Sequence, residues 1–144
     1  MYDQPTLIEL LNVVRVHLKD QIIPLLAEDN KLYPQTLAAI NALRIAEREL
    51  ILTTEHMQAE WQRLNFVQQV KTALPAAAET TREALTERNH KLCAQIAAGE
   101  FDAFPQKAAL FEHLLATTTE QVQVANPRFL QLLAREDAER ERKR

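Results

Sequence analysis

The stretch LAAINALRIAERELIL, residues 37–52, decides the fold. Its apolar side chains recur every three to four residues, which is the period of an amphipathic α-helix, and no segment of the chain alternates apolar and polar residues as a strand does. We expect this helix to begin near Pro34, because proline is tolerated in the first turn of a helix. The hydroxyl residues Thr53 and Thr54 predict an end or a bend, followed by a new helix over residues 53–71.

A first helix is expected over about residues 6–23. Thr6 precedes Glu9 by three residues, the spacing of a capping box that satisfies the free N–H groups at a helix start. The apolar residues that follow share one face at about 100° per residue: Leu7, Leu10, Leu11, Val14, Leu18 and Ile22.

Two later helices are bounded by recognisable start and stop signals in the sequence. Thr80 with Glu83 predicts a second capping box, and Gly99 is the expected left-handed terminator of that helix. A further helix is expected from Pro105 to residues 126–127, because the residue before a proline is pushed out of the helical region. Their predicted buried stripes are Leu85, Leu92 and Ile96 for the former, and Leu110, Phe111, Leu114, Thr118, Val122 and Ala125 for the latter.

Glycine scarcity narrows the fold class. The 144-residue chain has one glycine. A P-loop needs two and a dinucleotide fingerprint needs three, and the tight hairpins of an all-β domain also depend on glycine. We therefore expect an all-α, single-domain antiparallel bundle of five or six helices over residues 1–133. The mixed-charge segment 134–144 is expected to be a solvated or frayed tail.

The charge and cysteine counts exclude several other classes. The net charge of −3, from 17 basic and 20 acidic residues, gives no basic excess for nucleic acid. Cys93 is the single cysteine, which excludes an intramolecular disulfide and a thiolate zinc cluster. The first ten residues lack the basic region of a secretory signal, and no apolar run approaches the ~20 residues that span a bilayer. We expect a cytoplasmic protein that binds neither nucleic acid nor membrane.

Polar residues interrupt the apolar arc of the helix over residues 37–52: Asn41, Arg44, Glu47 and Arg48 all project within it. An unpaired buried charge is costly, so these side chains should have partners. An internal polar network is the first interpretation, with Asn89 as one possible mate from another helix. A surface facing a partner protein and a ligand site are the alternatives.

Catalytic and metal chemistry find little support in the sequence. Glu87 and His90 form a Glu-x-x-His pair, but the second such pair of a di-iron carboxylate site is missing, so we interpret them as a solvated pair and expect no metal. Cys93 is interpreted as a small buried hydrophobe rather than a nucleophile. No base accompanies the hydroxyls of residues 117–119, and Trp61 with Met57 reads as core or as an interface anchor. We expect no catalytic residues and no cofactor.

Several short motifs occur in a characteristic order: Pro5-Thr6 with Glu9-Leu10-Leu11, Asn41-Ala42-Leu43, Arg48-Glu49-Leu50, Asn89-His90-Lys91-Leu92 through Ile96, Gly99-Glu100 and Ala125-Asn126-Pro127-Arg128. In this order the chain resembles, over about residues 4–130, a family of small bacterial helical proteins known as DUF6285. It departs from the family at residues 28–33, where members usually carry a glycine and then an aromatic-histidine pair, and at Ala97, where a basic residue is common.

The resemblance implies a small accessory subunit without established catalytic residues. Genes of the family often lie beside those for an aminoglycoside-phosphotransferase-like kinase and an acyl-CoA dehydrogenase, which implies a kinase partner and a role in hydroxyacyl-CoA metabolism. Our first hypothesis is therefore a non-catalytic subunit that docks on such a kinase. The candidate polar-network or contact residues are Asn41, Arg44, Glu47, Arg48, Asn89, Asn126 and Arg128.

Two alternatives belong to other classes. One is an enzyme or small-molecule binder with a pocket between helices, in which Arg44 or Arg48 grips an acyl-CoA or another anion. The other is a bundle that associates only with itself as a homo-oligomer.

Overall fold

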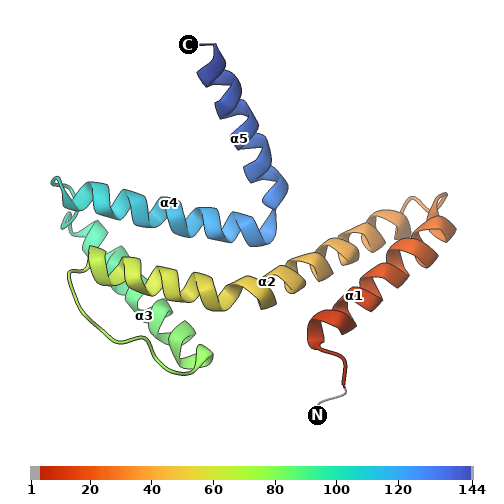
Figure 1. Ribbon diagram of the computed structural model, residues 1–144, viewed down its shortest axis with the longest axis horizontal. Helices are drawn as coiled ribbons and strands as arrows, with labels where there is room; N and C mark the ends of the chain where they lie inside the picture. Colours follow the sequence, from red (N-terminus) through yellow and green to blue (C-terminus); the bar gives the residue numbers. More distant parts are fainter. Residues whose placement is uncertain (1–3, 144) are drawn as a thin grey trace. The chain divides into compact units, whose positions relative to one another are not determined.

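Five α-helices and two short helical turns make up the computed structural model, which describes residues 4–143 (Figure 1). In chain order they are α1 (Leu7–His17), η1 (Leu18–Ile22), η2 (Ile23–Leu26), α2 (Leu32–Val67), α3 (Ala78–Ala97), α4 (Gln106–Ala125) and α5 (Pro127–Arg142). Within the described range there is no strand. The expected all-α bundle of five or six helices is confirmed. By their internal contacts the residues form two compact units, Met1–Leu52 and Thr53–Arg144, with α2 contributing to each.

The first unit begins with the predicted capping box. The Thr6 hydroxyl accepts from the Glu9 N–H at 3.2 Å, and the Glu9 carboxylate accepts from the Thr6 N–H at 2.7 Å. These hydrogen bonds, the backbone one above all, lower the pKa of Glu9.

The first helix changes its winding near its predicted end. After His17 the chain continues as the π-helical turn η1 and the 3-10 turn η2, where the N–H of Ile23 donates to the carbonyl of Leu18, five residues back. Pro24 follows directly and has no N–H, so the regular α-helical pattern cannot continue through it. The sequence located the end correctly to within a few residues but did not predict the change of winding.

Helix α2 runs unbroken from Leu32 to Val67, so the predicted end at Thr53 and Thr54, with a new helix after it, is wrong, whereas the alternative of a bend stays a prediction. The division between the two compact units falls at this position, between Leu52 and Thr53. Two threonines cost only a few tenths of a kcal/mol each within a helix, and the strong helix formers on both sides outweigh them. The start is fixed by Asp29, whose carboxylate accepts from the N–H groups of Leu32 and Lys31 at 2.7 and 2.9 Å. These backbone hydrogen bonds lower the pKa of Asp29.

The same motif ends α2 and α3. At the end of α3, Gly99 has φ +78°, its N–H donates to Ile96, and the N–H of Glu100 donates to Gln95, which confirms the predicted terminator. At the end of α2, Gln69 takes this position with φ +53°. Helix α2 therefore stops at Val67, a few residues before the predicted end at residue 71.

The start of α3 differs from the prediction. Its N-cap is Ala77 in an extended conformation, and Thr80 lies inside the first turn instead of capping it. The hydroxyl of Thr80 donates back to the carbonyl of Ala77 at 2.8 Å, and that of Thr81 donates to the same carbonyl at 3.0 Å. Threonine hydroxyls make such backward bonds readily, so the predicted capping box with Glu83 does not form.

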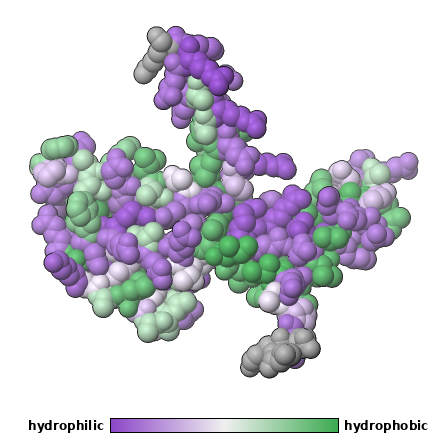
Figure 2. Space-filling view, viewed as in Figure 1, coloured by the Kyte–Doolittle hydropathy of each residue, from purple (hydrophilic) through white to green (hydrophobic). Residues whose placement is uncertain are grey.

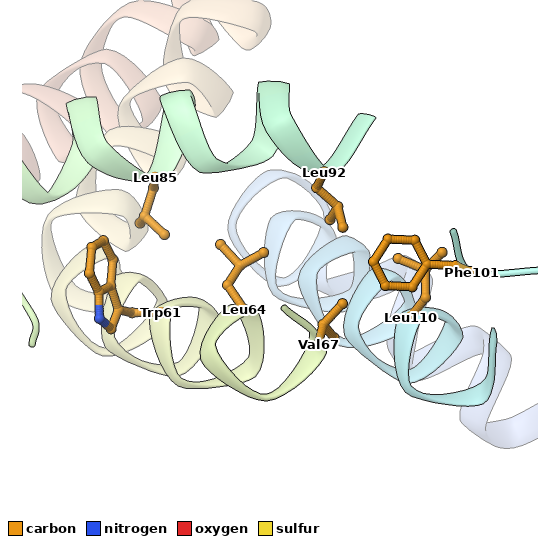
Figure 3. Close-up of a cluster of buried hydrophobic side chains, with 7 residues drawn as sticks. All are labelled: Trp61, Leu64, Val67, Leu85, Leu92, Phe101 and Leu110. Atoms are coloured by element: carbon orange, nitrogen blue, oxygen red, sulfur yellow. The ribbon is translucent and has the colours of Figure 1, made fainter. Parts of the chain in front are cut away.

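The hydrophobic core of the second unit lies among α2, α3, α4 and the segment between α3 and α4 (Figure 3). It consists of Trp61, Leu64, Val67, Leu85, Leu92, Phe101 and Leu110, with Met57, Ala84 and Ala109 packed against it. Trp61 and Met57 thus belong to the core, as the first of the two interpretations predicted. Ile96, predicted to be buried, is exposed.

Helices α4 and α5 meet at residues 126–127, the predicted break. Asn126 leaves the helical region with φ −149° and Pro127 opens α5. The described part of the expected tail is the second half of α5, where every residue from 134 to 143 is exposed and the surface is hydrophilic (Figure 2). No described helix is both long and apolar enough to span a bilayer.

Candidate functional site

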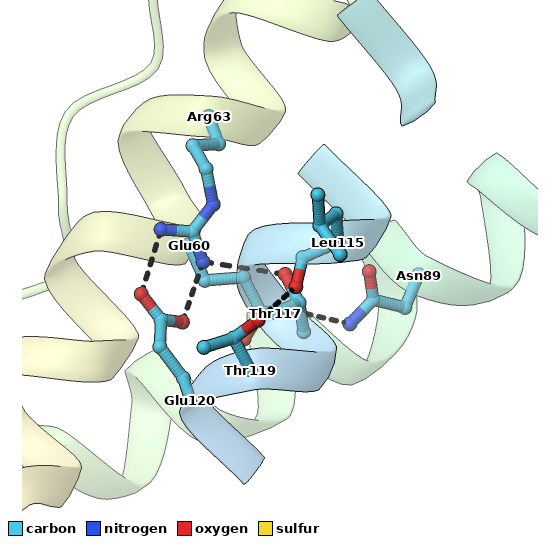
Figure 4. A network of polar contacts seen from close by, with 7 residues as sticks. All are labelled: Glu60, Arg63, Asn89, Leu115, Thr117, Thr119 and Glu120. Atoms are coloured by element: carbon cyan, nitrogen blue, oxygen red, sulfur yellow. Dashed lines mark hydrogen bonds and ion pairs between the residues drawn. The ribbon is translucent and has the colours of Figure 1, made fainter. Parts of the chain in front are cut away.

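A polar cluster joins α2 to α4 within the second unit (Figure 4). Arg63 forms a two-fold ion pair with Glu120, with Nη1 2.8 Å from Oε1 and Nη2 2.6 Å from Oε2. Nη2 also donates to the hydroxyl of Thr117 at 3.2 Å. The side chains of Arg63 and Glu120 are only 23% and 20% exposed. Because a bidentate pair has a fixed geometry, this contact sets the register of the two helices.

The inward face of α4 explains why the cluster forms. Leu110, His113, Thr117 and Glu120 follow at spacings of three and four residues, which puts them on one side of a helix. The predicted stripe of α4 is wrong in part, because Phe111 is 61% exposed and Leu114 is also exposed, whereas His113 is buried. Apolar residues lie on more than one side of α4, so the side that faces inward depends on the helix it packs against. Arg63 of α2 favours the side that carries Thr117 and Glu120.

His113 lies in this region with 3% of its surface exposed. Its Nδ1 has no hydrogen-bond partner, and the same is true of the buried Nε of Arg63. Burial lowers the pKa of His113, and the positive charge of Arg63 lowers it further, against smaller opposing effects of Glu60 and Glu120. The imidazole is therefore held neutral next to a guanidinium.

A second polar contact joins α2 to α3. Asn89 donates from Nδ2 to Glu60 Oε1 at 2.7 Å (Figure 4). Nearby, the guanidinium of Arg88 lies 4.5 Å from the centre of the Trp61 ring and donates to Gln68 Oε1 at 3.0 and 2.9 Å. The indole N–H of Trp61 donates to the carbonyl of Thr72 at 2.9 Å, which ties the segment after α2 to the core.

Four of the predicted site residues lie on α2 in the first unit. Glu47 accepts from Nε of Arg15 on α1 at 3.1 Å, with the two side chains 16% and 20% exposed. Arg15 also contacts Asn12. Arg44 and Arg48 are half-buried and Asn41 is exposed. Glu47 thus has a partner from α1, and the described contacts bring Arg15, which the sequence analysis did not single out, into this group.

The other three predicted site residues lie in the second unit. Asn89 contacts Glu60, as described above. Asn126 and Arg128 are exposed at the junction of α4 and α5, where the backbone N–H of Asn126 donates to Val122 at 2.7 Å. The seven residues are divided between the two units, four in the first and three in the second. Sequence analysis missed Arg63, His113 and Glu120 and set Thr117 aside for want of a base, although the spacing of His113, Thr117 and Glu120 after Leu110 was a usable signal.

The comparison with protein families gives a clear result. The family described as "Domain of unknown function (DUF6285)" matches residues 26–129, which is most of the chain. The chain belongs to the DUF6285 family. No curated protein and no solved structure matches it significantly.

The two other reactive groups of this DUF6285 protein lie at the surface. Cys93 is exposed, so its interpretation as a small buried hydrophobe is wrong. Cys93 lies on α3 about 80–100° around the helix axis from Leu85 and Leu92, at the flank of the side that faces the core. Glu87 and His90 are exposed as predicted, and Glu87 pairs with Lys91 at 2.9 Å. Over residues 4–143 no group of three potential ligands could hold a metal ion.

The polar cluster of this DUF6285 protein connects α2 and α4 through contacts between its own polar groups. The carboxylate of Glu120 is engaged by Arg63, and the hydroxyl of Thr117 accepts a hydrogen bond from the same guanidinium. In the described part of this cluster no hydroxyl donates to His113 or to a carboxylate, which is the contact that activates a nucleophile. The contacts present are those that lock helices together.

Proposed function

We propose that this DUF6285 protein is a non-catalytic accessory subunit that docks on a phosphotransferase-like kinase of the aminoglycoside-phosphotransferase type, with a role in hydroxyacyl-CoA metabolism. The kinase and its substrate class follow from the family resemblance. We place the complex in the cytoplasm as part of the same proposal, in keeping with the lone thiol at Cys93.

One structural observation supports the docking role above the others: an apolar seam on α1. Leu7, Leu10 and Val14, at the helical spacing of three and four, are 57%, 49% and 50% exposed. Beside them Leu11 and Leu18 are half-buried, and Arg15 reaches Glu47 of α2. Hydrophobic residues reach the surface in the region of α1 (Figure 2).

Such a seam is suited to a partner protein. Side chains at positions i, i+3 and i+7 are the contact pattern by which an amphipathic helix lies in an apolar groove. Covering three half-exposed aliphatic side chains contributes about 2–4 kcal/mol, enough to matter for affinity. Asn41 and Arg44, in the same unit, are candidate polar contacts with the partner.

A pair of valines on α1 allows a matched test. Val14 lies in the seam, whereas Val16 lies on the opposite side of the same helix and is 40% exposed. We expect Val14→Asp to weaken binding to the kinase at least about tenfold, since a charge would be buried in an apolar contact, and Val16→Asp to change it by less than about twofold. Co-expression with the kinase followed by gel filtration and titration calorimetry measures both, with circular dichroism as the check on folding.

The outcomes separate the proposal from its alternatives. Separate elution of the two proteins, with kinase activity unchanged by the added chain, would contradict it. Equal effects of the two substitutions on binding would show that the seam is not part of the interface with the kinase. If the chain alone elutes as a dimer that Val14→Asp makes monomeric, self-association replaces docking as the function of the seam.

A further inference from the structure

A trough runs along the junction of α2 and α4 in the second unit. It consists of a hollow of about 730 Å³ and a smaller one of about 320 Å³. The two share four lining residues, Phe66, Val67, Ala109 and Glu112, so one molecule can lie across both. Hollows of this size are typical of small-molecule sites.

The walls of the trough are mostly apolar where the two hollows meet, because Phe66, Val67 and Ala109 line both and Glu112 is the one charged residue among the shared four. Phe66 is 74% exposed, and Val70 in the larger hollow is also exposed. Ala108 and Ala109 form the opposite wall on α4 with side chains too small to fill the space. An exposed phenyl ring facing small alanines leaves room for an aliphatic chain.

One end of the trough is electropositive. Lys71 lines the larger hollow, and within the described residues its ammonium makes no hydrogen bond or ion pair. Pro105 and Gln106, where α4 begins, line the same hollow. The first turn of α4 has no acidic residue and no side-chain cap, so no side chain offsets the positive end of the helix dipole, although the N–H groups of Lys107 and Ala108 donate to the carbonyls of Ala103 and Pro105.

The other end of the trough carries no free positive charge. Arg63 lines the smaller hollow, but Glu120 neutralises it. His113 lies there as well, and Glu112 is placed where the hollows meet. An anionic group is therefore favoured at Lys71 and disfavoured at Glu112, which sets the direction of a bound molecule.

We propose that this trough binds an aliphatic carboxylate, with the carboxylate at Lys71 and the start of α4 and the hydrocarbon chain against Phe66, Val67 and Ala109. The trough belongs to the second unit and the seam on α1 to the first, so this inference goes beyond the proposed docking function and does not depend on it. A kinase-binding result on α1 variants neither supports nor weakens it.

The test compares two ligands of equal chain length, octanoate and 1-octanol, by titration calorimetry on the full chain. Octanoate is expected to bind saturably at one site, with a Kd below about 1 mM. Lys71→Glu is expected to weaken octanoate binding about fivefold to tenfold and to leave 1-octanol within about twofold, since the substitution acts on the head group. Lys19→Glu, the same charge change at an exposed lysine of the first unit, is expected to alter neither.

A second substitution examines the hydrocarbon end. Ala108→Phe fills the larger hollow and is expected to weaken both ligands about equally, with helicity by circular dichroism as the check on folding. The proposal is overturned if octanoate shows no saturation below about 5 mM, roughly fivefold above the expected upper limit of the Kd, or if Lys71→Glu and Lys19→Glu have equal effects. It is also overturned if the chain forms a dimer that Phe66→Glu dissociates, because a second copy would then occupy the trough.

Discussion

Gln69 occupies a backbone conformation that usually belongs to glycine. Its φ of +53° lies in the left-handed region, and the N–H groups of Gln69 and Val70 close the last turn of α2 by donating to Phe66 and Asn65. A residue with a side chain is strained there by about 1–2 kcal/mol. Gly99 performs the same task at the end of α3 without that cost.

We therefore expect Gln69→Gly to raise the free energy of unfolding by up to about 1 kcal/mol, because relief of strain exceeds the extra entropy of glycine in the unfolded chain. Urea unfolding followed by circular dichroism measures the change. Gln62→Gly is the matched control: this residue is exposed inside α2, where glycine should cost about 1 kcal/mol. A loss of stability in Gln69→Gly would show that the amide side chain itself holds the turn.

His113 makes stability depend on pH. Its pKa in the folded protein lies below its ordinary value of 6.5, because burial and Arg63 disfavour the charged imidazole. The unfolded chain therefore takes up a proton at a higher pH than the folded chain does. Stability from this group is complete above about pH 6.5 and is lost as the pH falls towards the folded pKa.

Unfolding at pH 7.5 and 5.5 should show this loss. It is limited to about 1.4 kcal/mol per pH unit for one proton, and His113→Gln should reduce the slope, whatever that variant does to stability at pH 7.5. The exposed His90→Gln serves as control and should retain the slope. An unchanged slope in His113→Gln would assign the pH dependence to other groups.

Among the helices, predictions succeeded where a terminus has a local chemical cause and failed where contacts elsewhere decide. The Thr6 box, the Gly99 terminator and the break at Pro127 each depend on neighbouring residues and are present. The continuous α2 could not be inferred from Thr53 alone, because a hydroxyl residue can cap a helix or lie within it. Helix α4 turns a different side inward than its apolar residues alone indicate.

The charged half of α5 is expected to contribute little to stability. Residues 134–143 are exposed, and the pairs of Arg140 with Glu136 and Asp137, at 3.9 and 3.8 Å, lie at the surface. Surface ion pairs of this kind are worth well under about 1 kcal/mol. Deleting residues 134–144 should therefore shift the free energy of unfolding by less than about 0.5 kcal/mol in a urea titration. A larger loss would move the end of the folded domain beyond the proposed boundary at residue 133.

For the molecule as a whole, the composition was enough to predict the fold class. It was not enough to predict which polar side chains pair across helices. One glycine and the helical period exclude strands and lead to an all-α chain. Partners across helices depend on tertiary packing: Glu47 could be expected to need a mate, but nothing in the sequence names Arg15, or Glu60 as the mate of Asn89. The Arg63–Glu120 pair joins residues 57 positions apart, which no local pattern predicts.

The single tryptophan gives the chain a built-in optical reporter. Trp61 is buried in the second unit, with Arg88 against its ring and its N–H on Thr72. Its fluorescence emission therefore reports on the packing of the second unit and not on that of the first. Far-ultraviolet circular dichroism, by contrast, reports on the helices of both units. Comparing the two melting curves tells, without any label, whether the halves of this protein come apart in one transition or in two.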